Sequence, residues 1–145
     1  MNIEEQVLTI EQARHLQKLG LDMSDAALCW AVGEMTFQDT TIKHQSVLAL
    51  DSKPQQYPFI KEIIPTYTLQ EMFGKLPTKI EMVDKDEDIH EVFIRFNNHI
   101  LWYDENLVFG GLRPFVSSYF KSPIIVAYEA LCWVLENGYL KEDNK

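Results

Sequence analysis

The chain has few cysteines, no long apolar run and fewer basic than acidic residues, and each shortage excludes a class of protein. Only two of its 145 residues are cysteines, so no disulfide framework is expected. Cys29 and Cys132 are each followed by tryptophan and surrounded by apolar residues, which is typical of buried, reduced thiols. No apolar run approaches the roughly 20 residues of a membrane-spanning helix. We therefore expect neither disulfides nor a membrane partner.

The shortage of basic residues weighs against nucleic-acid binding. Thirteen Lys and Arg residues face 22 Asp and Glu residues, which gives a net charge of -9. An acidic surface repels phosphate, so no nucleic-acid partner is expected. The acidity most simply favours solubility. The first six residues are acidic and lack the apolar segment of a signal peptide, so the expected location is the cytoplasm.

Catalytic and metal-binding motifs are also missing. The sequence contains no nucleophile elbow, Walker loop or dinucleotide fingerprint. The histidines form no zinc-ligand spacing with one another or with cysteine. His90-Glu91 resembles half of an acid–base pair, but surface histidines are the favoured interpretation. We therefore assign no catalytic, cofactor-binding or metal-binding residue, expect no cofactor, and favour a protein that is not an enzyme. The four histidines are His15, His44, His90 and His99.

The acidic run Asp84-Lys85-Asp86-Glu87-Asp88 partly matches a calcium-binding EF-hand loop. Its three aspartates occupy the first three ligand positions of such a loop. Ile89 then stands where the sharp turn needs glycine, and Arg95 stands where a bidentate glutamate is needed. The run therefore predicts a solvated turn between strands.

Three helices begin at recognisable capping signals. Thr9 and Thr68 each start a capping box, in which the threonine binds the amide three residues on and a Gln or Glu reaches back. Ser122 is expected to cap the third helix, and Pro123 at its first position loses no needed hydrogen bond. Glycine follows the first and third helices as a left-handed stop. The predicted helices are 10–19, 69–75 and 123–137.

Short apolar or β-branched stretches between the helices indicate strands. The stretch 28–32 suits either a buried strand or a buried helical turn. Asn97-Asn98 tolerates the positive φ of a hairpin turn, and Asp51–Pro58 indicates a loop. The other predicted strands are 36–41, 46–50, 80–83, 92–96, 100–103, 107–109 and 116–120. Together the elements predict one α+β domain over 1–145, with an antiparallel sheet of about four to six strands packed by about three helices.

An aromatic cluster and a glycine pair each have two interpretations. The aromatic residues either line a ligand groove or, as we favour, fill the space between sheet and helix. Gly110-Gly111 indicates a turn that needs positive φ rather than a phosphate site, because no lysine or helix start follows it. The aromatic residues are Trp102, Tyr103, Phe109, Phe115, Tyr119 and Phe120.

Three segments resemble small uncharacterised proteins that are encoded in prophages and other mobile elements of gut bacteria. The segments are Thr9–Ser24, Ile64–Ile80 and Ala127–Leu140. Their residues are mainly helix caps and apolar faces, so the resemblance concerns fold and origin. It implies a phage-related source and no particular activity or site residue.

Three functions are compatible with these features. The first is a non-catalytic accessory or interaction domain of a mobile element that binds another protein. The second is an acidic mimic of nucleic acid that inhibits a host defence enzyme, which predicts carboxylates clustered on one face. The third is a small enzyme or ligand-binding domain with an unrecognised pocket, which predicts a cleft where His90 or His99 meets a carboxylate. An exposed edge strand would also allow a homo-oligomer to form.

Overall fold

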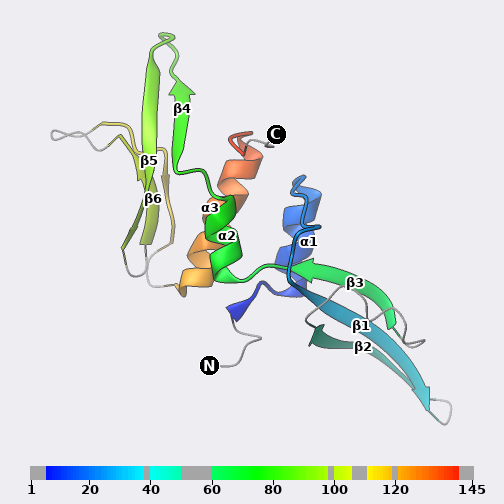
Figure 1. Ribbon diagram of the computed structural model, residues 1–145. Coiled ribbons are helices and arrows are strands. Elements are labelled where there is room, and N and C mark those ends of the chain that lie inside the picture. The colour runs from blue at the N-terminus through cyan, green and yellow to red at the C-terminus, as the bar shows by residue number, and fades with distance from the viewer. Residues whose placement is uncertain are drawn as a thin grey trace. The chain divides into compact units, whose positions relative to one another are not determined.

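The computed structural model confirms the α+β class, with three helices and two antiparallel sheets among the residues that it describes (Figure 1). The chain divides into two compact units, Met1–Glu71 and Met72–Lys145, and each contains one sheet. The prediction of a single domain over 1–145 stays a prediction. The structure describes residues 6–37, 40–49, 60–97, 100–105, 111–118 and 121–140, apart from the side chains of 34–37, 40–49, 60 and 61.

The first unit contains helix α1 and a three-stranded sheet in the order β2-β1-β3, with both pairs antiparallel. Helix α1 contacts β3, and its buried face comprises Ala13 and Leu16. The elements are α1 (Ile10–Lys18), β1 (Leu28–Phe37), β2 (Thr40–Ala49) and β3 (Ile60–Thr66). The largest fully buried side chains of this unit are Leu8, Leu16, Met23 and Tyr67.

The segment that precedes α1 is part of this core. The carbonyl of Leu8 accepts hydrogen bonds from Trp30 Nε1 and Thr66 Oγ1, each at 2.9 Å. The Leu8 amide donates to the Tyr67 carbonyl at 3.1 Å. The buried polar groups of Trp30 and Thr66 are thereby satisfied, as burial requires. The segment is therefore held to β1 and to the end of β3.

The strands of the first unit differ in part from those that the sequence predicts. Residues 28–32 belong to a strand, which extends to Phe37. A single strand over 36–41 is wrong, because Phe37 ends β1 and Thr40 begins β2, and these two residues pair across the hairpin. The sequence predicts no strand where β3 lies, and β3 contains Pro65. Proline is tolerated there because β3 is an edge strand.

The second unit contains a four-stranded antiparallel sheet in the order β4-β5-β6-β7. Helix α3 contacts β6 and β7, and Trp133 on this helix packs its ring 5.6 Å from Tyr103 and 5.2 Å from Phe115. The elements are β4 (Lys79–Val83), β5 (Ile89–Asn97), β6 (Ile100–Asp104), β7 (Phe115–Val116) and α3 (Pro123–Glu136). Helix α2 (Leu69–Lys75) spans the boundary between the units.

The two faces of the four-stranded sheet differ in their burial. Successive side chains of a strand alternate between the faces, and paired residues share one. The face that carries Tyr103 and Phe115 packs against α3, and its other buried members are Ile80, Val92 and Leu101. We call the opposite one the helix-distal face. Its apolar members are Val83, Ile89, Phe93, Ile100, Trp102 and Val116.

The capping boxes at Thr9 and Thr68 are confirmed. The helices lie at 10–18, 69–75 and 123–136, so two of them end one residue earlier than predicted. The predicted side-chain cap of Ser122 is wrong, because its side chain makes no cap hydrogen bond. The Ser122 carbonyl instead accepts from the amides of Ile125 and Val126. The amide that a serine cap would bind is therefore already satisfied.

The strands form two sheets rather than the single sheet that the sequence predicts. Predicted strands 80–83, 92–96 and 100–103 are confirmed within β4, β5 and β6. Residues 46–49 lie in β2. Strand β7 ends at Val116, so the predicted strand 116–120 is wrong at Ser117 and Ser118. The predicted strand 107–109, the loop 51–58 and residues Asn98, Tyr119 and Phe120 lie outside the described residues.

Candidate functional site

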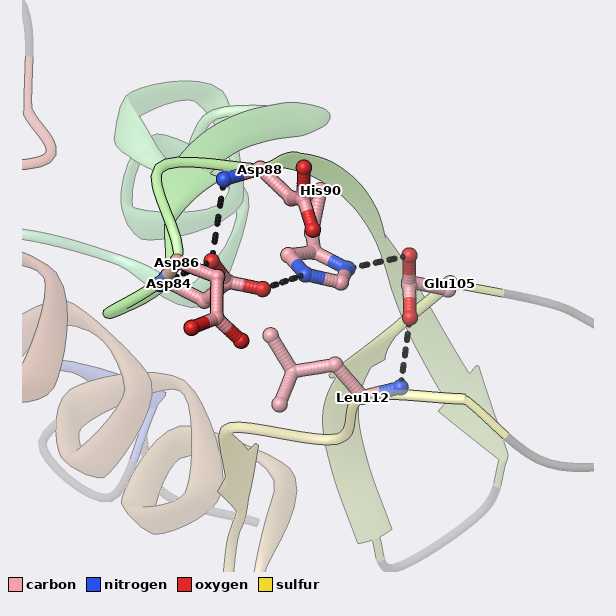
Figure 2. Close-up of polar contacts among 6 residues, drawn as sticks. All are labelled: Asp84, Asp86, Asp88, His90, Glu105 and Leu112. Carbon is pink, nitrogen blue, oxygen red and sulfur yellow. Dashed lines mark hydrogen bonds and ion pairs between the residues drawn. The ribbon is translucent and has the colours of Figure 1, made fainter.

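The imidazole of His90 lies between two carboxylates in the second unit (Figure 2). His90 Nε2 is 2.7 Å from Asp84 Oδ2, and His90 Nδ1 is 2.8 Å from Glu105 Oε2. All three side chains are partly buried. We call this the His90 cluster. It joins groups from three places along the chain: the turn after β4, strand β5 and the residue after β6.

The turn between β4 and β5 holds the first carboxylate. Asp84 Oδ1 accepts from the amides of Asp86 at 2.8 Å and Asp88 at 2.9 Å. The Asp84 amide in turn donates to the Asp88 carbonyl at 3.0 Å. Glu87 adopts a φ of +65°, which closes the loop. One oxygen of Asp84 therefore organises the turn, while the other faces His90.

A second anchor fixes Glu105. Its Oε1 accepts from the Leu112 amide at 2.7 Å, and its own amide donates to the Leu112 carbonyl at 3.1 Å. Glu105 thus binds the chain that leads into β7 with one carboxylate oxygen and His90 with the other. The His90 cluster therefore connects the β4–β5 turn to the segment that contains Leu112.

The electrostatics of the His90 cluster favour a charged imidazole. Hydrogen bonding to Asp84, followed by hydrogen bonding to Glu105, raises the pKa of His90 to about 8. The bond to His90 holds the pKa of Asp84 below its usual value, and the Leu112 amide, followed by His90, does the same for the pKa of Glu105. A histidine donates from both ring nitrogens only when it is protonated. At neutral pH the His90 cluster is therefore an imidazolium between two carboxylates.

This arrangement limits the chemistry of His90. A general base or a metal ligand needs an unprotonated ring nitrogen with an accessible lone pair. In His90 both nitrogens face carboxylate oxygens at hydrogen-bond distance. Within the described part of the chain, no group of three or more His, Cys, Asp or Glu residues is placed to hold a metal ion. The geometry is that of an ion-pair cluster that connects segments.

The structure brings together only some of the residues that the sequence singled out. The run 84–88 forms the predicted turn between strands. Glu91 is not the partner of His90, because neighbours in a strand point to opposite faces, and it lies 3.4 Å from Lys79 Nζ. His15 is exposed on α1. The side chain of His44 and the whole of His99 lie outside the described residues.

The role of Glu105 was missed because no short-range spacing reveals it. Glu105 lies 15 residues after His90 and reaches it only through the pairing of β5 with β6. The position of Asp84 carries a partial signal, because Met82 pairs with His90 and Asp84 lies two residues after Met82, on the same face of the hairpin. The register of a hairpin would have brought Asp84 near His90.

The aromatic residues divide between the two faces of the sheet. Tyr103 and Phe115 pack on Trp133, in accord with the core interpretation. Trp102 lies on the helix-distal face, where its Nε1 donates to Asp104 at 2.8 Å and Arg113 lies over its ring. Phe109, Tyr119 and Phe120 lie outside the described residues, as does Gly110, while Gly111 has the expected positive φ of 120°.

The cysteines and one pocket add no reactive group to the His90 cluster. Cys29 is buried, Cys132 is partly buried, and neither forms a disulfide. Burial raises the pKa of Cys132 to about 11, so its thiol stays protonated at neutral pH. A pocket of about 630 Å³ in the second unit is not lined by His90. Its lining includes Lys75, Lys79, Glu81 and Tyr139.

Comparisons with models of protein families, with curated proteins and with solved structures find no match to the chain. Among the described residues, no helix combines the length and the apolar character that crossing a membrane requires.

Proposed function

We propose that the chain is a non-catalytic interaction domain that binds another protein through the helix-distal face of its four-stranded sheet. The observation that carries this proposal is the exposure of two apolar side chains at the β4–β5 hairpin. Val83 is 66% exposed and Ile89 is 67% exposed, and the two residues pair directly across the strands. Val116, which is also exposed, lies on the same face.

The charges of this face indicate what kind of partner it suits. Lys79 Nζ lies 3.4 Å from Glu91, and Asp104 lies 3.5 Å from both Arg95 and Arg113. The face therefore presents apolar side chains among charged side chains, most of which form ion pairs. Such a surface matches a protein partner with a complementary apolar patch, because burying apolar area provides most of the free energy of association.

The two other functions receive less support. A nucleic-acid mimic needs a row of unpaired carboxylates, whereas Glu62, Glu91 and Asp104 each lie within ion-pair distance of Arg or Lys. An enzyme that uses His90 needs a free ring nitrogen, and both nitrogens face carboxylates. The resemblance to proteins of prophages and mobile elements adds that the partner belongs to such an element or to its host.

The test is a comparison of two variants with the wild-type protein. Val83→Thr with Ile89→Thr keeps the β-branched shape and adds two hydroxyls to the contact surface. Burying a hydroxyl without a hydrogen bond costs about 1–3 kcal/mol, so binding should weaken at least tenfold. Lys85→Ser, in the exposed turn beside the pair, is the matched control and should bind normally. Circular dichroism verifies that both variants remain folded.

The measurement begins with affinity capture from the source organism and quantitative mass spectrometry. The proposal requires that the wild-type protein and Lys85→Ser capture a protein that the double threonine variant does not capture. The purified partner should also bind the wild-type protein and Lys85→Ser more tightly than it binds the double threonine variant. Light scattering measures the molecular mass of the purified chain and so shows whether the chain binds a second copy of itself. In that case the partner would be a second copy of the chain. Equal capture by all three proteins would refute the role of the helix-distal face.

A further inference from the structure

The two hydrogen bonds of His90 depend on a single proton. A neutral imidazole has one N–H and can donate to only one carboxylate. Its other nitrogen would then direct a lone pair at the second carboxylate, which is 2.7 or 2.8 Å away. That contact is repulsive, so the two oxygens cannot both stay in place after His90 loses a proton.

The ends that His90 joins are each stable without it. Asp84 keeps its place in the β4–β5 turn through the amides of Asp86 and Asp88, and Glu105 keeps its place through the amide of Leu112 (Figure 2). Loss of the proton therefore leaves both anchors intact and breaks the link between them. We infer that the His90 cluster is a pH-sensitive latch, which fastens the β4–β5 turn to the segment around Leu112 when His90 is protonated and releases it when His90 is neutral.

The surrounding charges set the direction of the switch. The turn also carries Lys85, Asp86, Glu87 and Asp88, so its net charge is negative even without Asp84. The charged groups of the other elements interact with partners other than His90. Glu91 forms an ion pair with Lys79, and Asp104 forms ion pairs with Arg95 and Arg113. Glu129 of α3 accepts a hydrogen bond from Ser118. The charges that act on His90 are thus mainly negative and favour its protonated form.

The pH range follows from these contacts. The pKa of His90 is raised from 6.5 to about 8, so the latch is closed at neutral pH and opens as the pH rises through about 8. Because the pKa values of Asp84 and Glu105 are lowered, both carboxylates stay ionised in mildly acidic solution. This behaviour is a property of the second unit and does not depend on the proposed binding function.

Nuclear magnetic resonance of the 145-residue chain tests the latch directly. The ring signals of His90, assigned by their loss in His90→Gln, should titrate with a midpoint near 8. Asp84→Asn and Glu105→Gln keep the oxygens that accept backbone amides but remove one negative charge each, so both should lower this midpoint. Glu81→Gln removes a carboxylate from the opposite face of the same hairpin and should leave the midpoint unchanged.

A second signal reports whether the link opens. The methyl resonances of Leu112 should shift with the same midpoint as His90 in the wild type and should lose this titration in His90→Gln. A wild-type midpoint at or below 6.5, or a midpoint that neither Asp84→Asn nor Glu105→Gln changes, would overturn the inference. Leu112 methyls that do not respond while His90 titrates would also overturn it, because the two ends would then not be released.

Discussion

Replacing Leu131 with alanine tests how strongly helix α3 stabilises the second unit. Leu131 is 0% exposed, and its buried helix neighbours Ala127 and Ala130 are too small to fill a gap. The change removes three carbon atoms, each contributing about 0.8 kcal/mol when buried. Because the cavity adds to this transfer term, we expect a loss of about 3–4 kcal/mol in the free energy of unfolding. That loss is a large part of the 5–15 kcal/mol typical of a domain.

The measurement is urea unfolding of the 145-residue chain, monitored by circular dichroism and by tryptophan fluorescence. The midpoint should fall while the slope with urea stays the same, since the surface exposed on unfolding hardly changes. Glu136→Ala is the control: Glu136 lies exposed near the end of α3, and its loss should change stability by less than about 0.5 kcal/mol. A loss below about 1.5 kcal/mol for Leu131→Ala at an unchanged slope would refute the argument from burial and cavity.

Two further predictions concern hydrogen bonds. Thr9→Ala and Thr68→Ala should each cost about 1 kcal/mol in urea unfolding, because each threonine caps the amide three residues on, whereas Ser122→Ala should change stability by less than about 0.5 kcal/mol. Equal losses at all three positions would contradict the cap assignments. Tyr103→Phe should cost about 1–3 kcal/mol, since the buried Tyr103 hydroxyl donates to the Pro77 carbonyl at 2.6 Å; an unchanged stability would mean that water replaces this bond.

The helices could be predicted because their signals are local. The capping boxes at Thr9 and Thr68 involve residues only three apart, and Gly20 and Gly138 have the positive φ values expected of helix stops, 105° and 72°. These patterns satisfy the unpaired amides and carbonyls at helix ends, and this requirement does not depend on the rest of the fold. Helix bounds were accordingly predicted to within one residue.

The division into two sheets and the His90 cluster could not be predicted because they depend on pairing between distant segments. Strand β3 pairs with β1 across more than 25 residues, and its Pro65 weighs against a strand until its edge position is known. His90 meets Glu105 only once β5 and β6 are in register. Composition and spacing carry no information on such pairings.

The carbonyl of Leu8 has a consequence for the order in which the chain is completed during synthesis. Its partner Thr66 lies 58 residues later, and Val7 forms a bridge with Thr68. At roughly 5–20 residues per second, a ribosome needs about 3–12 s to make the intervening chain. The segment that contains Val7 and Leu8 therefore lacks these two contacts for that time. A chaperone that shields nascent apolar segments would find a target in the segment that contains Val7 and Leu8.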